Sequence, residues 1–233
     1  LARAATGAGA VLSTGTPVRR LQRDDGRWRL RTPGGTVTAR AVVLGTNAYT
    51  DGLWPGLRDI FLPIHFFQLA TEPLGERAQG ILRAGQGLWD TGPVMFSLRR
   101  DAEGRLLIGS MGKVVGGPGG LSERWAARTL ARLFPRLGPV RFAEAWHGRL
   151  AMTPDHLPRI YRLAENLYTP IGYNGRGITT GTVFGKAMAD LLAGGREADL
   201  PLPVTAPSRH RLAPVLGPLY QAAFTANQLW KIF

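Results

Sequence analysis

The most informative stretch of the chain is Tyr168-Thr169-Pro170-Ile171-Gly172-Tyr173-Asn174-Gly175-Arg176-Gly177-Ile178. A short apolar run leads into a cluster of glycines, and the residues behind it, Thr179–Ala193, have the composition of a helix. Glycine tolerates positive φ and lets bare backbone approach a ligand closely. The first helical turn would then offer its N–H groups, with the positive end of the helix dipole behind them, to an anion or to the electron-poor edge of a cofactor ring that turns anionic on reduction. The stretch therefore predicts a binding loop at the start of a helix.

The composition indicates a globular protein of one large domain or two small ones. The chain has 233 residues, of which 44% are hydrophobic and 19% charged, as is typical of folded domains. It contains no apolar run of the roughly 20 residues that a membrane span needs. The absence of cysteine excludes disulfides, thiolate metal sites and a cysteinyl link to a cofactor. We therefore expect a cytoplasmic protein with no metal site and no membrane span.

The charge balance is strongly basic but does not identify a function. The chain carries 29 Lys and Arg against 16 Asp and Glu, a formal charge of +13. Such a balance attracts nucleic acids and other anionic partners. The arginines are scattered, however, and no nucleic-acid recognition motif accompanies them. A solvated basic surface, or a missing acidic partner segment, is the simpler interpretation, and a basic nucleic-acid-binding domain remains the alternative.

Short apolar segments separated by Gly, Pro and Asp predict many strands. The first group resembles an antiparallel meander with a hairpin turn at Asp24-Asp25-Gly26, and its expected strands are Ala10–Ser13, Val18–Gln22, Arg27–Arg31 and Val37–Ala39. The run Ala41–Thr46 is apolar throughout, as in a strand buried on both faces. The expected later strands are Ile64–Thr71, Val94–Arg99, Leu106–Gly109, Arg141–Leu150, Arg159–Leu163 and Leu167–Ile171. Two further helices are expected, one that Ser122 caps and that ends near Leu133, and a short one over Leu219–Ala226.

The usual dinucleotide-binding motif is missing from the N-terminal part. That motif is a strand, a G-x-G-x-x-G turn and a helix. Gly7-Ala8-Gly9 supplies the first two glycines, but no third glycine and no predicted helix follow. The late cluster has glycines at 175, 177 and 181, but no second strand comes after its helix to complete a βαβ unit. We therefore do not expect an independent nucleotide-binding fold.

Several segments in a fixed order resemble the glycine/D-amino-acid oxidase family of FAD-dependent oxidoreductases, and in particular its bacterial γ-glutamylputrescine-oxidase-like members. The segments are Ala41–Thr50, Pro63, Gln68–Leu74, Trp146–Asp155, Leu157-Pro158 and Gly172–Gly177. The resemblance covers almost the whole chain but only about the C-terminal half of a family member. It implies an α/β (α+β) fold in which part of an FAD-binding domain with a mixed sheet accompanies an antiparallel substrate-domain sheet. The N-terminal ADP-binding βαβ unit would be missing.

The resemblance also implies a division of the chain and a set of cofactor-binding residues. Residues 1–60 would belong to the FAD-binding domain, 61–145 to the substrate domain, 146–200 again to the FAD-binding domain, and 201–233 to a C-terminal tail. The residues expected at a non-covalently bound FAD are Val18, Thr46, Asn47, Trp146, Gly172, Asn174, Gly175, Arg176, Gly177 and Ile178. The glycine loop would lie along the pyrimidine side of the flavin, where negative charge collects on reduction.

Substrate and catalytic residues follow less directly from the resemblance. His147 and Tyr173 are candidate catalytic residues, and His65 and Gln68 are candidates for the substrate pocket, while Asp155 is expected to shape a turn. The implied activity is oxidation of an amine or amino acid by hydride transfer to the flavin. We expect weak or no FAD binding by this chain alone. One half of a split enzyme and a non-catalytic remnant stay as alternatives.

Overall fold

The computed structural model describes residues 1–210 and 212–232, which form two compact units. The first unit comprises Leu1–Ile60, Pro158–Ile171 and Gly177–Ser208, and the second comprises Phe61–Leu157, Gly172–Arg176 and Arg209–Phe233. The first change of unit falls between residues 60 and 61. The expected boundary at residue 146 falls inside a strand, because the second unit continues to Leu157.

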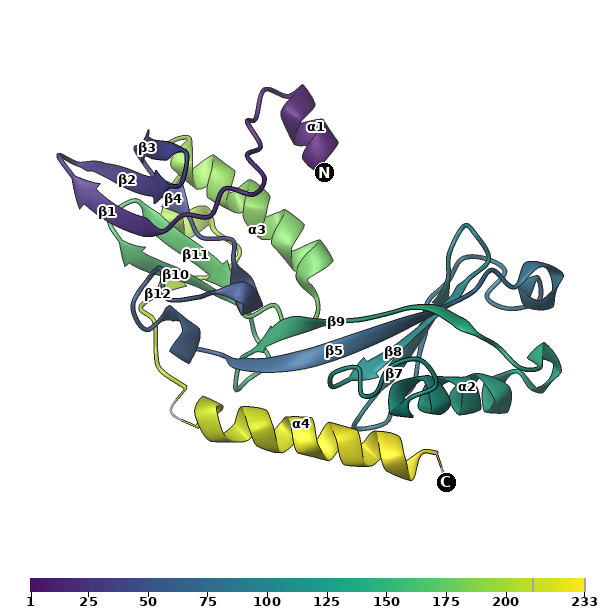
Figure 1. Ribbon diagram of the computed structural model, residues 1–233. Helices are drawn as coiled ribbons and strands as arrows, with labels where there is room; N and C mark the ends of the chain where they lie inside the picture. The colour runs from purple at the N-terminus through teal and green to yellow at the C-terminus, as the bar shows by residue number, and fades with distance from the viewer. Residues whose placement is uncertain (211, 233) are drawn as a thin grey trace. The chain divides into compact units, whose positions relative to one another are not determined.

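The first unit contains two small sheets (Figure 1). The antiparallel sheet β1-β2-β3 consists of β1 (Arg20–Asp24), β2 (Arg27–Thr32) and β3 (Gly35–Ala39). The mixed sheet has the order β12-β10-β11-β4, and its strands are β4 (Val42–Val43), β10 (Arg159–Ala164), β11 (Leu167–Ile171) and β12 (Val204–Thr205). The helices are α1 (Ala2–Gly7) and α3 (Gly177–Leu192), and the 3-10 turns are η1 (Asn47–Tyr49), η2 (Leu57–Asp59) and η5 (Glu197–Asp199).

The N-terminal predictions were correct for the hairpin and wrong at two other places. Asp25 and Gly26 connect β1 to β2 with φ values of 46° and 72°, as a two-residue turn between twisted strands requires. Residues 10–13 form no strand, because the helix α1 precedes them and they continue it as irregular chain. The apolar run at 41–46 is not buried on both faces. Its strand β4 is short, pairs only with β11 among the described strands, and leaves Val43 37% exposed.

The second unit is built on one antiparallel five-stranded sheet of order β6-β7-β8-β5-β9 (Figure 1). Its strands are β5 (Leu62–Thr71), β6 (Leu88–Trp89), β7 (Phe96–Arg100), β8 (Leu106–Met111) and β9 (Phe142–Met152). The helix α2 (Leu121–Leu133) covers one face through Trp125, whose ring meets that of Phe67 edge-on at 5.3 Å. The turns η3 (Gly75–Ala78) and η4 (Pro135–Leu137) complete the unit.

The last helix is longer than its sequence indicated, and it packs against the sheet of the second unit. It extends over Ala213–Trp230 as α4 and contains Pro218. Its Phe224 packs with Leu62 and Ile64 of β5, so this segment belongs to a core. Gln228, 1% exposed, accepts a hydrogen bond from the hydroxyl of Ser122 in α2. Ser122 lies inside α2 and not at its cap, since Gly120 occupies that position.

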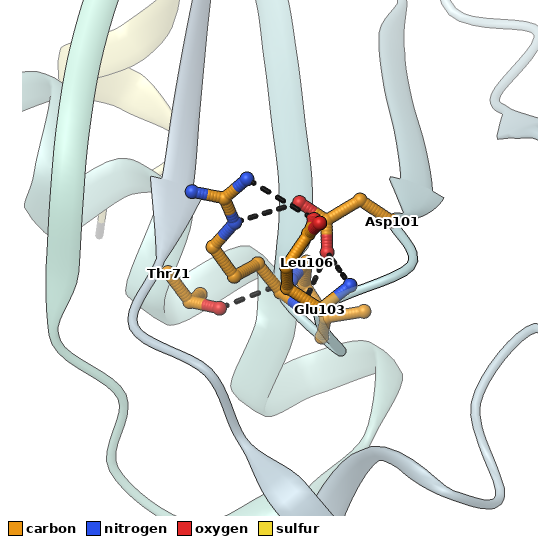
Figure 2. Close-up of polar contacts among 5 residues, drawn as sticks. Thr71, Asp101, Glu103 and Leu106 are labelled. Atoms are coloured by element: carbon orange, nitrogen blue, oxygen red, sulfur yellow. Dashed lines mark hydrogen bonds and ion pairs between the residues drawn. The ribbon is translucent and has the colours of Figure 1, made fainter.

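The turn between β7 and β8 is closed by its own side chains (Figure 2). The carboxylate of Asp101 accepts hydrogen bonds from the backbone N–H of Glu103 at 3.1 Å and of Arg105 at 2.8 Å. The guanidinium of Arg105 donates to the same carboxylate at 2.7 Å. Next to the turn, the N–H of Leu106 donates to the hydroxyl of Thr71 at 3.0 Å. Both groups of that last bond are buried, so the start of β8 is fixed to the end of β5.

Candidate functional site

Two neighbouring parallel strands of the first unit end at the same edge of their sheet. β4 and β11 run parallel, with Val42 opposite Leu167 and Val43 opposite Tyr168. The hydroxyl of Thr169 donates to the carbonyl of Leu44 at 2.8 Å, which continues the connection past the end of β4. Ligands of open α/β sheets bind outside the carboxyl ends of such strands. The segments that follow β4 and β11 are therefore the candidate binding segments.

The segment after β4 is a tight turn fixed by hydroxyl groups. Thr46 and Asn47 begin it, and Asn47 has a φ of 42°. The hydroxyls of Thr46 and Thr50 lie 2.8 Å apart, and that of Thr50 donates to the carbonyl of Asn47 at 2.7 Å. The turn is thus held in one conformation at the strand edge. Thr46 and Asn47 therefore follow the end of β4, and their contact with a cofactor stays a prediction.

The segment after β11 requires glycine at two positions. Gly172 has a φ of 80° and Gly175 a φ of 84°, a region that other residues rarely adopt. A Cβ at position 172 would lie 2.5 Å from the Cγ2 of Thr153, which is closer than two carbons can approach. The chain can therefore turn out of β11 and into α3 only with glycine at residue 172.

Asn174 holds the loop through its side chain. Its Oδ1 accepts the backbone N–H of Thr153 at 2.8 Å, and its Nδ2 donates to the hydroxyl of Thr153 at 3.0 Å and to the carbonyl of Gly172. Its own backbone N–H donates to Ala151 at 3.2 Å. Asparagine is also tolerated at its φ of 51°. Asn174 therefore fixes the loop and does not have its amide free for a ligand.

The beginning of α3 reaches the surface of the molecule. Gly175 and Arg176 are exposed, Gly177 is half-buried and Ile178 is 87% exposed. The first N–H groups of any α-helix have no partner inside the helix, and the helix dipole is positive there. The loop thus offers backbone donors at an accessible position and not in a sealed apolar interior. These residues fit the electron-rich pyrimidine edge of a flavin.

Val18, the remaining cofactor candidate of the first unit, lies just before β1. It is half-buried between exposed neighbours, and the N–H of the next residue, Arg19, donates to the carbonyl of Arg31 at 2.7 Å. The strand predicted over 18–22 thus begins two residues later. Its proposed contact with adenine stays a prediction.

A row of four residues crosses the sheet of the second unit on the face opposite α2. The register places Trp146 of β9 beside Gln68 of β5, Gln68 beside Gly109 of β8, and Gly109 beside Ser97 of β7. A Cβ on Gly109 would lie 2.7 Å from the Cδ of Gln68, so the carboxamide of Gln68 lies directly over this glycine. The Nε2 of Gln68 donates to Ser97 at 3.5 Å. Gln68 Oε1 is buried and has no hydrogen-bond partner among the described residues.

His65 and His147 lie on the other face of the same strands. Side chains alternate along a strand, so His147 is turned away from Trp146 and His65 away from Gln68. The two imidazole rings meet edge-on at 5.5 Å. His147 and Trp146 therefore cannot approach one ligand from the same face of the sheet, and neither can His65 and Gln68.

His65 lines a separate groove of about 830 Å³ in the second unit, together with Lys113 and side chains of α4. Burial, followed by the nearby cations of Lys113, His147 and Arg149, lowers the pKa of His65. This histidine is thus kept neutral over a wider pH range than usual. It belongs to the packing of α4 and not to the face that carries Gln68.

Tyr173 stands in the glycine loop and is half-buried. Burial raises the pKa of its phenol, so the side chain stays protonated and can donate a hydrogen bond at neutral pH. Asp155 shapes a turn as expected, since its carboxylate accepts the N–H of Leu157 at 3.2 Å. The described residues contain no group of three or more His, Cys, Asp and Glu that could hold a metal ion. Within that part of the chain, no helix has the length and apolar character of a membrane span either.

The chain belongs to the family of FAD dependent oxidoreductases to which the glycine/D-amino-acid oxidases give their name, since the family matches residues 1–191. The fold agrees with this assignment. A glycine oxidase from Geobacillus kaustophilus has a similar structure, with a TM-score of 0.67 and 25% identity over 90% of this chain. An iminodiacetate oxidase from Chelativorans is similar in fold, with a TM-score of 0.68, 19% identity and 88% of this chain covered.

Two bacterial relatives give the sequence context. A γ-glutamylputrescine oxidoreductase of Escherichia coli is 33% identical over 172 residues, which are 72% of this chain and 40% of the relative. A probable oxidoreductase of Haemophilus influenzae is 27% identical over 206 residues, 84% of this chain and 46% of the relative. The chain spans less than half the length of these relatives, and 56% and 57% of the two solved structures. The resemblance read from the sequence is confirmed, including its restriction to part of a family member.

Three residues of the site region were not predicted from the sequence. Thr153 holds Asn174, Gly109 leaves room for the carboxamide of Gln68, and Ser97 orients that carboxamide. The only available signal was for Thr153, which lies in the recognised Trp146–Asp155 segment. Gly109 and Ser97 are distant in sequence from Gln68, and only strand pairing brings them beside it.

Proposed function

We propose that this chain supplies the flavin-edge loop and part of the substrate face of an FAD-dependent oxidoreductase that oxidises an amine or amino acid. In this proposal the C–H bond beside the nitrogen breaks, its hydride passes to the cofactor, and the resulting imine is hydrolysed by water. The bound FAD would supply the two-electron acceptor, which later returns its electrons to oxygen or another acceptor. The absence of cysteine supports a cytoplasmic location.

The glycine loop carries this proposal. Its φ values of 80° at Gly172 and 84° at Gly175, together with the three side-chain hydrogen bonds of Asn174, fix the backbone before α3. The N–H groups at Gly177 and Ile178 would stabilise negative charge without reorganising when it develops. Thr46 and Asn47, at the neighbouring strand end, would bound the same cofactor.

On the substrate side, Gln68 is the residue best prepared to hold an amine. Its buried Oε1 has no partner in the described chain, and leaving a buried acceptor unpaired costs about 1–3 kcal/mol. An N–H of a neutral amine would satisfy this oxygen and orient the nitrogen. Trp146, which is 43% exposed beside Gln68, would shield the nitrogen from water. No strong base is needed for hydride transfer from an amine held at short range.

The proposal predicts little or no FAD binding by the chain alone, because most pyrophosphate and ribose contacts would come from an ADP-binding unit. The test is a flavin titration of the chain with and without a separately expressed N-terminal half of the Escherichia coli relative. Flavin uptake and amine oxidation that appear only on mixing would support the proposal. A folded chain that stays indifferent to both would indicate a non-catalytic remnant. A purified chain that is yellow and releases FAD would overturn the prediction of weak binding.

Gln68→Leu tests the substrate side in the complemented enzyme. Losing the amide oxygen should raise KM for the amine about 10- to 100-fold, equivalent to one buried hydrogen bond, with flavin binding unchanged. Gln22→Leu, an exposed glutamine on β1, is the matched control and should change neither. Equal kinetics for the two variants would remove Gln68 from the site.

A further inference from the structure

The helix α4 carries no charged side chain, although the chain as a whole is strongly basic. None of the residues from Ala213 to Trp230 is Asp, Glu, Lys or Arg. Its inner side is used for folding, since Phe224 is 6% and Gln228 1% exposed. The sequence of a helix that covers a domain edge would normally place charged residues on the other side. The outer side of α4 has none.

The outer side of α4 instead exposes large apolar side chains. Val215 is 69%, Leu219 62% and Trp230 82% exposed. Exposed apolar groups in such continuity are uncommon on soluble surfaces and usually mark a contact with another phase or molecule.

Cations surround the C-terminal end of this strip. Arg128 and Arg132 of α2, Trp230 of α4 and the neighbouring Lys231 line one depression of about 560 Å³. Arg124, Arg128 and Arg132 are all exposed and lie four residues apart, so they follow one side of α2. Lys231 is partly balanced by Asp90 at 3.9 Å, and the arginines therefore dominate the positive charge.

The sequence around the two helices contains few acidic residues. Residues 124–143 include five arginines and neither Asp nor Glu, and residues 200–233 include three Lys or Arg and again no acidic residue. The nearest acidic residue of α2, Glu123, accepts the N–H of Gly119 at 2.7 Å. The surface made by α2 and α4 thus combines an uncharged apolar strip with a strong excess of positive charge.

We propose that α4 is a docking helix that lies flat on an anionic lipid membrane, with the α2 arginines on the headgroups. A helix that lies in the interface buries its apolar side among the upper acyl chains, and Trp is favoured at headgroup depth. Arginines beside it are attracted to anionic lipids, by about 1 kcal/mol each, or about fivefold in affinity. Such a helix rests on a bilayer and does not cross it. A second protein could cover an apolar strip, but a surface with this excess of positive charge matches a lipid surface of uniform negative charge.

The experiment is vesicle co-sedimentation of the full 233-residue chain. One set of vesicles is phosphatidylcholine alone, and the other contains about one third phosphatidylglycerol, the anionic probe for the α2 arginines. The chain should sediment with the anionic vesicles, release at high salt, and bind the neutral vesicles at least tenfold more weakly. Size-exclusion chromatography without lipid and a titration with double-stranded DNA are run in parallel.

Variants separate the apolar strip from the arginines. Leu219→Glu and Trp230→Ser should each weaken binding to anionic vesicles about tenfold or more. Arg128→Gln combined with Arg132→Gln should weaken it about 25-fold on anionic vesicles and leave binding to neutral vesicles unchanged. Val37→Glu on β3 and Trp89→Ser on β6 are matched controls at exposed positions outside the strip and should have no effect. Circular dichroism verifies that every variant folds.

Four results would overturn the proposal. The first is a chain that binds neither kind of vesicle. The second is a concentration-dependent dimer that Leu219→Glu abolishes while vesicle binding stays absent, which would assign the strip to a second copy. The third is binding to DNA but not to anionic vesicles, which would assign the arginines to nucleic acid. Equal losses in the control and strip variants would also contradict it.

Discussion

Two loops of this molecule are each organised by one short polar side chain, but the segments that follow them differ in their exposure to solvent. Asp101 closes the β7–β8 turn by accepting N–H groups from Glu103 and Arg105, and the Arg105 guanidinium completes the network. Asn174 fixes the loop after β11 in a similar way, through Thr153 and Gly172. The Asp101 turn leads directly into a buried strand. The Asn174 loop leads into a helix whose first residues are exposed.

The difference separates a structural turn from a binding loop. In the Asp101 turn the polar groups satisfy one another, and the next N–H, that of Leu106, is bonded to Thr71. In the Asn174 loop the side chain holds the backbone in place while the helix N-terminus behind it stays accessible. Rigid loops before an accessible helix N-terminus are suited to charge stabilisation, because the donors need no rearrangement.

The largest expected effect comes from Gly172→Ala. The new Cβ would clash with Thr153 and force a residue with a side chain to a φ of 80°. We expect a loss of about 3 kcal/mol in the free energy of unfolding, measured by urea denaturation, and loss of flavin uptake in the complemented enzyme. Gly185→Ala in α3 is the control, since a Cβ there meets nothing within 4 Å and alanine favours a helix. Similar stability of the two variants would show that the loop is not constrained.

Asn174→Ala should have the next largest effect. It removes the bonds to Thr153 and leaves the backbone N–H of that buried partner unsatisfied, at a cost of about 2 kcal/mol. Asn166→Ala is the matched control. Asn166 also has a positive φ, 56°, in the turn between β10 and β11, so it reports the cost of alanine in that conformation alone. The contribution of the Thr153 bonds is the difference between the two variants, and a difference of zero would contradict their role.

The smallest effect is expected for Asp101→Asn, and it should depend on pH. Partial burial alone would raise the pKa of Asp101. The hydrogen bonds from the backbone N–H and the guanidinium of Arg105 have a larger, opposite effect, so the pKa lies below its ordinary value. Stability from this ionised group is therefore complete above about pH 4 and is lost as pH falls through the lowered folded-state pKa.

The asparagine variant has no carboxylate to protonate. At pH 7 its Tm should be lower than that of the unaltered chain by less than about 2 °C, because the pair is partly screened by solvent. The gap should close as the pH is lowered from 4 to 3 in thermal unfolding experiments. A gap that stays constant over this range would show that the charge of Asp101 does not stabilise the turn.

Local sequence patterns predicted much of the fold, for reasons that the two loops illustrate. Glycine and asparagine are the residue types that favour positive φ, so the loop at Asn174 could be predicted from its own sequence. The strand β5 and the hairpin at Asp25 also depend on residues that are neighbours in the sequence. Strand pairing is not local, and so the overlap of Gln68 with Gly109 could not be anticipated. The length of α4 was missed because Pro218 suggested an irregular tail, whereas the helix is held by packing against β5.

The candidate site was predicted in its backbone part and less well in its side chains. The turn at Thr46 and the loop at Gly172 follow recognisable strand ends, and the two strands that precede them are paired in parallel. His65 and Gln68 appeared equivalent in sequence, three residues apart on one strand. An odd separation along a strand places two side chains on opposite faces, and the groove beside α4 is lined by His65 and not by Gln68.

The most direct test of the loop's role is an amide NMR titration of the isotopically labelled chain with FAD at millimolar concentrations. We predict saturable shifts concentrated at the N–H groups of Gly175, Gly177 and Ile178 and at the Thr46 turn. The Asp101 turn should remain unaffected. Saturable shifts confined to other segments would contradict the claim that the start of α3 faces the flavin.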